Sequence, residues 1–402
     1  MTATWLTPSR IRVHGLLLAV CLWTVYAIDM STPGLRDQNG LIKGTDFLHF
    51  YTLGNIALQK RGDLLYDMQA QTALLQNLVP AAAGNVYVPL YGPQVSLLFA
   101  PFARTSYPAA LTVWLLLNAV IYGTCWYLVW KHCPNLRARP WTVLIAALAF
   151  PGFFYLILWG QTSGLALLCF TLAFLALNKN RPYLAGLAIG SLIFKPQLGM
   201  AAAVIFLFAR EWKVVAGAIL AALAQLSIGW LYYGIPVIRE YLRALMNVRD
   251  VLPILEPRPH QMHSLRAFWS LLIPWPALAF VLYGATAVAV LAVAARSWRS
   301  KTSLGLRYSA LMLATVLVAP HLTVYDLLIL APALLLLADW TVDTNPAGFA
   351  ALMPILIYLC YPLFLLGSLA RVTHLQLSVI AMTGLLFLID RDRNVPRNAY
   401  IA

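Results

Sequence analysis

Long apolar blocks limit what this sequence can fold into more than any other feature. Residues 107–130 and 269–295 contain no charged side chain, and a helix needs about 20 apolar residues to cross a bilayer. Charged residues make up 10% of the chain, whereas a soluble domain carries about 25%. Such a chain cannot cover a surface that faces water, so we expect an integral membrane protein.

The apolar blocks are continuous and do not alternate with polar residues, which favours helices over a membrane β-barrel. We therefore predict an all-α polytopic membrane protein with about 11–13 transmembrane helices, among them spans near residues 12–30, 107–130, 141–158 and 214–233. Residues 1–402 would form a single integral membrane domain. The first apolar run ends at Asp29 without a small-x-small cleavage site, so we expect a retained first span and no removed signal peptide.

The basic residues indicate how the chain is oriented. More than half of the 28 lysines and arginines fall in short segments between apolar blocks, such as 131–139 and 296–307. Short loops of this kind are cytoplasmic under the positive-inside rule. This places both termini in the cytoplasm, in a cytoplasmic (inner) membrane. One segment on the opposite face, 234–267, breaks the rule with five arginines: Arg239, Arg243, Arg249, Arg258 and Arg266. A functional need for cations on the outer face would explain them.

Two large extracytoplasmic loops are expected, at residues 31–106 and 234–267. The first contains DLLYDMQAQTALLQNLV, whose leucines recur at helical spacing. It continues into VYVPLYGPQVSLLFAPFARTSYP, which prolines break into pieces too short to span, so we predict an interfacial or re-entrant helix there. The second loop is expected to hold a surface helix followed by a proline-rich turn.

Several function classes are unsupported by the sequence. The net charge of +14 would suit nucleic acid, but no solvated basic domain carries it, so we expect no nucleic-acid partner. The five cysteines are scattered without a CxxC pair, and we expect neither a metal site nor a cofactor. The phosphate-binding patterns GxxxxGK[ST] and GxGxxG are absent, which argues against nucleotide chemistry.

The unusual polar residues fall on one face of the predicted bundle. They follow the first span or lie in turns on the same side: Asp46, His49, Gln161, Lys195, His260, His263, Arg266, His321 and Asp326. Ionisable groups at a membrane edge are costly to place and usually have a function. Cations and a carboxylate together suit a lipid substrate that carries phosphate, because cations bind the phosphate and a carboxylate can deprotonate a hydroxyl.

Each of these residues also has a structural explanation. Asp46 could be a helix N-cap, and Lys195 could extend its ammonium to the interface. His321 could be a hydrogen-bonded turn histidine. Asp326 could pair locally, and Gln161 could satisfy the backbone of its turn.

Nearby aromatic residues fit an interfacial belt, which would face the headgroup region of the bilayer. These are Phe47, Phe50, Tyr51, Tyr87 and Tyr91.

A series of segments in fixed order resembles glycosyltransferase family 87, the polyprenol-phosphate-mannose-dependent α-1,2-mannosyltransferases. The segments are DFLHFYTLGNIAL, GDLLYD, VYVPLYGPQVSLLFAPF, WGQTSGL, GLAIGSLIFKPQLG and VAPHLTVYDLLIL. The resemblance implies a GT-C-type helical bundle whose extracytoplasmic loops form the active site. It also implies a polyprenyl-phosphate-linked sugar donor, with mannose the expected hexose, and a lipid or glycan acceptor.

The resemblance implies roles for individual residues. The family's catalytic Asp after the first membrane helix matches Asp46, its Lys-Pro hairpin matches Lys195-Pro196, and its late histidine turn matches His321. In some members a second histidine follows directly, whereas Leu322 stands there in this chain, which bears on the acceptor and the sugar.

We predict that Asp46 is the catalytic base. Donor-phosphate binding is expected from Lys195, Arg266, His321, Gln161 and His263. Supporting roles are expected for His49, Tyr66, Asp67, Tyr91 and Asp326. A transporter or flippase for a lipid or glycan is the alternative, although transport favours polar groups near the bilayer midplane.

Overall fold

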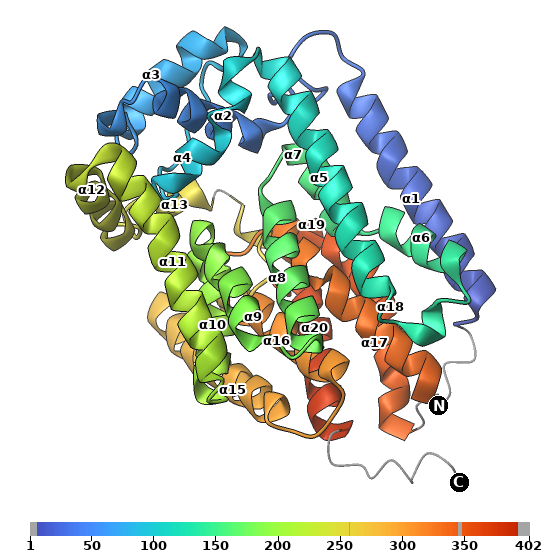
Figure 1. Ribbon diagram of the computed structural model, residues 1–402. Helices are drawn as coiled ribbons and strands as arrows, with labels where there is room; N and C mark the ends of the chain where they lie inside the picture. The colour runs from blue at the N-terminus through green and yellow to red at the C-terminus, as the bar shows by residue number, and fades with distance from the viewer. Residues whose placement is uncertain (1–5, 257, 345–347, 393–402) are drawn as a thin grey trace.

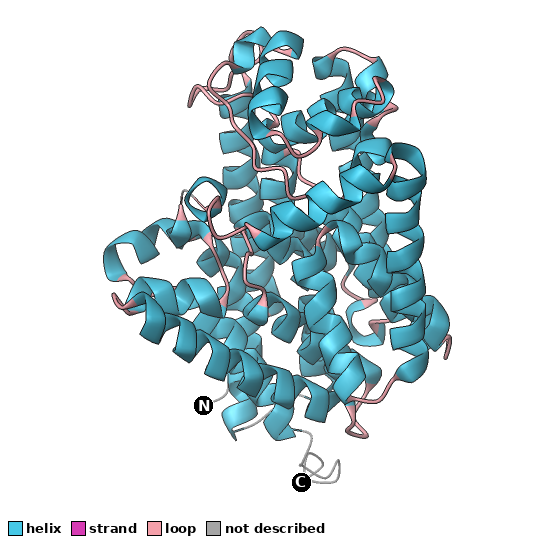
Figure 2. Cartoon of the chain, turned by 90° about the vertical axis from the view of Figure 1, so that its left-hand side faces the viewer, coloured by secondary structure: helices cyan, strands magenta, loops and turns pink. Residues whose placement is uncertain are grey.

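The computed structural model describes residues 6–256, 258–344 and 348–392. Helices account for most of this part of the chain, and it contains no strand, only two isolated β-bridges. Figure 2 shows loops only as connections between helices. The expectation of an all-α membrane protein is confirmed.

Six helical segments of the described chain are long and apolar enough to cross a membrane. They are α1 (Pro8–Met30), α5 (Tyr107–Trp130), α11 (Trp212–Tyr233), α15 (Pro276–Trp298), η7 (Val324–Leu330) with α17 (Ala331–Thr344), and η8 (Gly348–Ala351) with α18 (Leu352–Leu365).

Two bent pairs raise the number to as many as eight. They are α6 (Pro140–Leu148) with α7 (Pro151–Trp159), bent by 44°, and α19 (Gly367–Thr373) with α20 (Leu377–Asp392), bent by 108°. Four shorter apolar segments are α8 (Ser163–Asn178), α9 (Pro182–Gly190) with η5 (Ser191–Phe194), α10 (Pro196–Phe208) and α16 (Leu304–Val318). The expected number of about 11–13 spans is reached only if at least three of these four also cross.

The remaining helices lie mostly in the two expected loops. The first loop holds α2 (Thr45–Leu58), η1 (Gly62–Leu64), α3 (Met68–Leu78), η2 (Pro80–Ala82), α4 (Gln94–Phe99) and η3 (Phe102–Arg104). The second holds α12 (Ile235–Met246), α13 (Leu252–Leu255), η6 (Pro259–Gln261) and the start of α14 (Leu265–Leu272), and η4 (Pro134–Leu136) precedes α6. The amphipathic helix expected in the first loop is therefore present as α3.

Proline determines where many of these helices begin. It is the first residue of α6, α7, α9, α10 and α15. Proline lacks an N–H that the first helical turn would leave unpaired, and its fixed φ angle suits that position. Residues 141–158, expected as one span, are consequently two helices, because Pro151 begins a new one.

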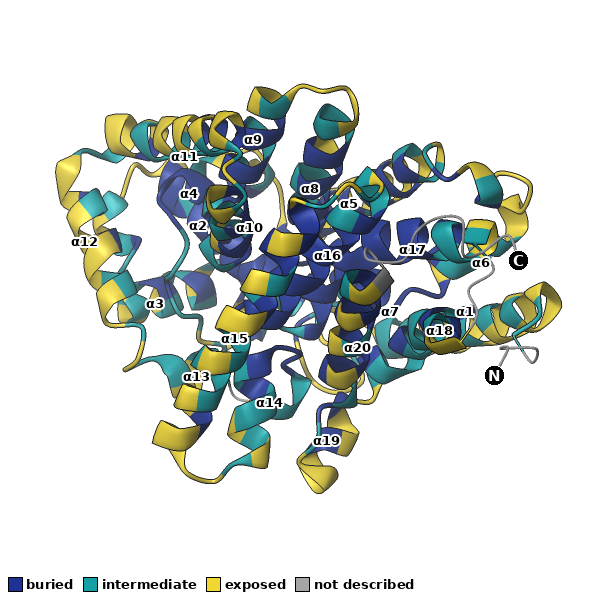
Figure 3. Ribbon diagram, turned by 90° about the horizontal axis from the view of Figure 1, so that it is seen from below, coloured by how far each residue is buried: buried dark blue, intermediate teal, exposed yellow. Residues whose placement is uncertain are grey.

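Helix α16 forms the centre of the bundle. Eleven consecutive residues, Tyr308–Val318, are buried, and Figure 3 shows α16 in the middle with exposed helices such as α12 and α15 towards the edge. Figure 1 shows α2, α3 and α4 at one end of the molecule and the start of α1 at the other. The Asp46 region and the N-terminal end of α1 thus lie at opposite ends of the bundle.

Candidate active site

Asp46 lies in the first turn of α2, at the end of the bundle formed by the first loop. The helix is preceded by Gly44 in the left-handed conformation, with φ of 65°. Gly44 is the N-cap, so the explanation of Asp46 as the capping residue is wrong. The Asp46 side chain is half-buried, and its Oδ2 accepts a hydrogen bond of 2.9 Å from Gln161 Nε2.

The surroundings of Asp46 shift its pKa towards neutrality. Desolvation by burial raises the pKa from 3.8 to about 6, against the lowering effects of the Gln161 hydrogen bond and of the charges on Lys195 and His321. The nearby charge on Asp326 raises it further. A carboxylate with a pKa near the working pH is well suited to accept a proton in a reaction.

Gln161 is held against α2 by the turn that follows α7. Gly160 has φ of 67°, and a Cβ built there would lie 2.8 Å from Phe47 Cβ. Trp114 Nε1 donates to the Gly160 carbonyl at 2.8 Å. Within the turn, Gln161 Oε1 accepts a bond of 2.9 Å from the Thr162 N–H. Gln161 therefore satisfies its turn and also orients Asp46.

Lys195 and Asp326 form a buried ion pair beside this turn. Lys195 Nζ lies 2.6 Å from Asp326 Oδ1, and the two side chains are 4% and 1% exposed. Ser163 Oγ donates to the same oxygen at 2.6 Å and accepts from Lys195 Nζ at 2.9 Å. The Lys195 ammonium therefore points into the protein and does not extend to the membrane interface.

Arg266 and His321 form a second charged cluster around Glu256. His321 Nδ1 donates to Glu256 Oε1 at 2.9 Å, while Arg266 forms an ion pair with Glu256 Oε2 and donates to the Pro320 carbonyl. The Arg266 and His321 side chains remain about one-fifth exposed, whereas Glu256 is 8% exposed. The hydrogen bonds with His321 and Arg266 and their positive charges hold the pKa of Glu256 below its usual value, against the opposing effect of burial.

Two backbone contacts join the second loop to the late turn that carries His321. Met262 and Thr323 form an antiparallel β-bridge, and the His263 N–H donates to the Leu322 carbonyl at 3.1 Å. Because His321 also acts electrostatically on Asp46, the two charged clusters belong to one region.

Two expected site residues have structural roles instead. His263 is 1% exposed with Nδ1 2.7 Å from Ser378 Oγ. Burial lowers its pKa to about 3, so the imidazole is neutral and cannot supply a cation to a phosphate. Asp67 is the N-cap of α3, where Oδ1 accepts from Gln69 N and Ala70 N at 3.0 Å each.

The supporting residues divide between the site and its surroundings. The Tyr91 side chain lies against Gln161 and Thr162, near Asp46 and Asp326. Tyr66 is one layer further out, and its hydroxyl donates to the Tyr91 carbonyl at 3.0 Å.

His49 is 4% exposed, and burial lowers its pKa to about 4. Its ring stacks on Tyr87 at 5.2 Å between centroids. His49 therefore lies close to Asp46 as a neutral packing residue.

The interpretation of the neighbouring aromatics as an interfacial belt is wrong for Phe47, Phe50 and Tyr51. Phe47 and Phe50 are 0% and 1% exposed and pack on Phe99, and Tyr51 is also buried. They form the core beneath the Asp46 helix, where they fix its position.

Two residues of the site do not stand out from the sequence as those above do. Ser163 lies within the WGQTSGL segment, two positions from Gln161. Its nearness to Gln161 in that segment could have predicted its presence in the site. Glu256 is one of only 14 acidic residues in the chain, and it lies in the same segment as the five outer-face arginines. An acidic residue among those arginines is the sequence feature that could have identified it.

A family comparison supports the assignment of this region to an enzyme. A family model described as Glycosyltransferase family 87 matches residues 90–320. This range includes Gln161, Lys195 and Arg266, whereas Asp46 precedes it and His321 and Asp326 follow it. No curated protein and no solved structure matches the chain. Among the described residues, no group of three or more His, Cys, Asp or Glu side chains could hold a metal ion. Because the match spans more than half of the sequence, the chain belongs to glycosyltransferase family 87 and is a membrane glycosyltransferase.

Proposed function

We propose that this enzyme transfers a hexose, with mannose the first candidate, from a polyprenyl-phosphate-linked donor to a lipid-linked or glycan acceptor. Asp46 is the general base. The observation that carries the proposal is a half-buried carboxylate with a pKa of about 6, in one region with the side chains of Lys195, Arg266 and His321. Such a constellation fits a reaction in which a hydroxyl loses a proton and a phosphate leaves.

The two carboxylate oxygens of Asp46 have different proposed roles. Oδ2 accepts from Gln161, while Oδ1 accepts no hydrogen bond from any residue that the structure describes and is the oxygen that would take the proton. The acceptor oxygen then forms a bond to the anomeric carbon of the donor, and the bond from that carbon to the phosphate oxygen breaks. The electron pair of the broken bond leaves with the phosphate.

Arg266 and His321 are the groups proposed to stabilise the leaving phosphate. Both are partly exposed, and Arg266 provides a planar set of N–H donors that matches phosphate oxygens. Charge grows on the phosphate as the bond breaks, so fixed cations stabilise the transition state more than the ground state. Lys195 donates to Asp326 and Ser163 and lies over the Tyr325 ring, so its proposed contribution to the donor phosphate is that of a buried positive charge.

The orientation that fits this chemistry places Asp46 on the extracytoplasmic face and both termini in the cytoplasm. The segments that precede α6 and α9 lie at the other end of the bundle from α2. They carry Arg137, Arg139 and Arg181, which fits the positive-inside rule. Residues 1–402 then form one integral membrane domain, with residues 31–106 and 234–267 facing the outside and the α4 region interfacial or re-entrant.

A variant of the base tests the proposal. Membranes carrying Asp46→Asn should transfer no detectable sugar from a panel of radiolabelled polyprenyl-phosphate hexoses, while wild-type membranes yield a labelled product. Asp63→Asn is the matched control, because Asp63 lies in the same loop and is exposed in an ion pair with Arg61. Transfer by Asp46→Asn at the control rate would disprove the assignment. A product formed only from nucleotide sugars would disprove the donor.

A further inference from the structure

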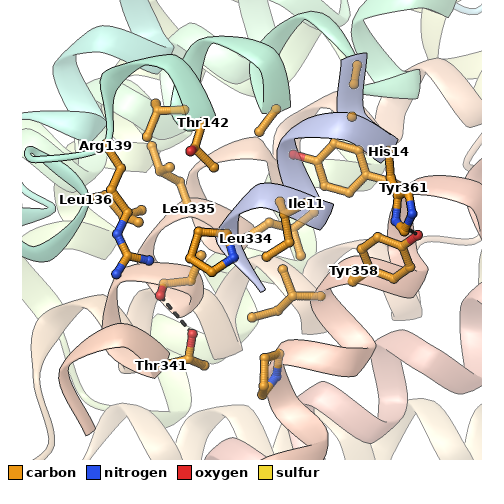
Figure 4. Close-up of a pocket in the computed structure, with 18 of the residues that line it drawn as sticks. Ile11, His14, Leu136, Arg139, Thr142, Leu334, Leu335, Thr341, Tyr358 and Tyr361 are labelled. Atoms are coloured by element: carbon orange, nitrogen blue, oxygen red, sulfur yellow. Dashed lines mark hydrogen bonds between the residues drawn. The ribbon is translucent and has the colours of Figure 1, made fainter. Parts of the chain in front are cut away.

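A cavity of about 350 Å³ lies far from Asp46, between α1, α6, α17 and α18 (Figure 4). Its volume falls within the range of about 300–1,000 Å³ typical of small-molecule sites. Carbon atoms dominate the lining, with Ile11, Leu18, Val143, Leu334 and Leu335 among the contributors. Only two described residues of α1, Ala19 and Leu22, are buried, so α1 packs loosely and leaves this space unfilled.

The cavity lies within the apolar part of the bundle, at the end opposite the candidate active site. Its α1 residues, Pro8 to Leu18, belong to the first half of that helix, and Figure 1 shows this half at the other end from α2. Next to them, Leu16 and Leu17 are 53% and 60% exposed. Hydrocarbon chains of the bilayer therefore surround this part of α1.

Polar groups are confined to the edges of the lining. Figure 4 shows Arg139 and Thr341 at one edge, and His14 and Tyr358 at the other. The His14–Tyr358 contact, 2.9 Å between Nδ1 and the hydroxyl, connects α1 to α18. The Arg139 guanidinium, by contrast, forms no hydrogen bond or ion pair with any residue in the described part of the chain, and the Thr142 hydroxyl likewise has no partner there.

We propose that this cavity binds an acyl chain of an anionic phospholipid from the leaflet opposite Asp46, with the lipid phosphate held by Arg139 and Thr142. The carbon lining accepts the chain, and the cation at its edge, which has no acidic partner among the described residues, favours an anionic headgroup. Basic pockets between transmembrane helices on the cytoplasmic side have this property in general. A zwitterionic lipid would offer the same chain but a weaker match to the charge.

The position of Arg139 argues against the sugar donor as the occupant. The proposed donor phosphate binds at the Asp46 end, whereas Arg139 directly precedes α6, whose start lies at the other end of the bundle from α2. A lipid that reaches this cavity with its headgroup at Arg139 therefore comes from the opposite leaflet. It would fill the gap beside α1 and stabilise the folded state, because it binds that state and not the unfolded one.

The test uses the purified full-length protein in detergent, with phosphatidylglycerol or phosphatidylcholine added. Native mass spectrometry measures lipid binding, and the melting temperature measures stabilisation. We expect wild type to bind phosphatidylglycerol more tightly and to melt higher with it. Arg139→Gln should weaken phosphatidylglycerol binding about fivefold, since a basic side chain near the surface contributes about 1 kcal/mol. Arg181→Gln is the matched control, because Arg181 is exposed at the same end of the bundle but does not line the cavity.

A second variant tests the chain site separately from the charge. Ala338 lines the cavity, and Ala338→Phe should reduce binding of both lipids. Leu18→Trp serves the same purpose if Ala338→Phe does not fold. The proposal is overturned if wild type shows no preference for phosphatidylglycerol, or if Arg139→Gln and the folded filling variant both bind it as wild type does. Displacement of phosphatidylglycerol from wild type by polyprenyl phosphate would also overturn it, because the cavity would then hold the donor chain.

Discussion

The Asp46 carboxylate is partly exposed, and its pKa is raised to about 6. As the proposed base, Asp46 would act only when deprotonated, so kcat/KM should fall about tenfold for each pH unit below that pKa. We expect the rate to rise as the pH rises through about 6. Steady-state transfer measured from about pH 5 to about pH 8 checks this.

The same shift predicts the effect of Asp46 on stability. Its pKa in the folded state is about 6, higher than the usual value of 3.8. The stability of the fold therefore decreases as the pH rises from 3.8 to about 6, and the ionised carboxylate destabilises the protein at neutral pH. Asp46→Asn should therefore lose activity without losing thermal stability at neutral pH. A variant that melts well below wild type would show that Asp46 has a structural role, and a pH profile of wild type that stays flat around pH 6 would contradict its role as the base.

The Lys195–Asp326 pair gives a second prediction about single residues. Lys195→Met leaves the Asp326 carboxylate buried without its cation, and breaking a buried pair costs about 3–5 kcal/mol. The double variant Lys195→Met with Asp326→Asn removes both charges, so it should recover most of that loss. Unfolding in detergent measures the two values. Equal destabilisation of the single and double variants would show that the charges are not energetically coupled.

The scarcity of charge along the chain explains which site residues are predictable. Asp46, Gln161, Lys195 and His321 interrupt apolar sequence in turns on one side, so a common location follows from the sequence alone. The direction in which a side chain points does not follow from it. His263 is in the expected turn but points into the core, and Asp67 caps its own helix.

Among the helices, α9 and α11 approach closely because glycines line their contact. A Cβ added at Gly186 would lie 2.1 Å from the Val214 carbonyl oxygen, whereas at Gly123 in α5 it would meet nothing within 4 Å. Gly186→Ala should therefore destabilise the protein by about 1–3 kcal/mol through overpacking. Gly123→Ala should be neutral or slightly stabilising, because alanine favours a helix by about 1 kcal/mol. If Gly186→Ala and Gly123→Ala lowered the melting temperature equally, the close contact between α9 and α11 at Gly186 would be refuted.

The cap of α3 gives a prediction for an element of the outer loop. Asp67→Ala removes the acceptor for Gln69 N and Ala70 N, which costs about 0.5–2 kcal/mol. Asp67→Asn keeps a capping oxygen and should retain most of the stability. Both variants should keep the wild-type kcat/KM. A selective loss of kcat in Asp67→Asn, without a change in melting temperature, would return Asp67 to the active site.

Helix positions are predictable from apolar length and proline, and the limits of that prediction are physical. The spans expected at residues 12–30, 107–130 and 214–233 correspond to α1, α5 and α11. The single span expected at 141–158 is broken, because Pro151 cannot continue the preceding helix and the chain bends by 44°. The burial of α2 is not predictable, because its aromatic residues suit an interface and a core equally well.

In the whole molecule, two groups of charged residues lie at opposite ends of the bundle. Asp46, Arg266 and His321 lie in one region, while the segments before α6 and α9, which carry Arg137, Arg139 and Arg181, lie at the other end of the bundle from α2. The first group suits chemistry on a phosphate. The second suits anchoring in the cytoplasmic leaflet. One arrangement of the bundle in the membrane therefore satisfies both the reaction and the topology.

This orientation can be tested in intact cells with single cysteines. The background is Cys21→Ala, because Cys21 is the one exposed cysteine among the described residues. Asn77→Cys on α3 and Arg181→Cys before α9 are both exposed positions at opposite ends of the bundle. A maleimide that cannot cross the membrane that holds the protein should label Asn77→Cys from outside the cytoplasm, but Arg181→Cys only after lysis. The reverse pattern would place Asp46 in the cytoplasm, where nucleotide sugars are available, and would remove the reason for a polyprenyl-phosphate donor.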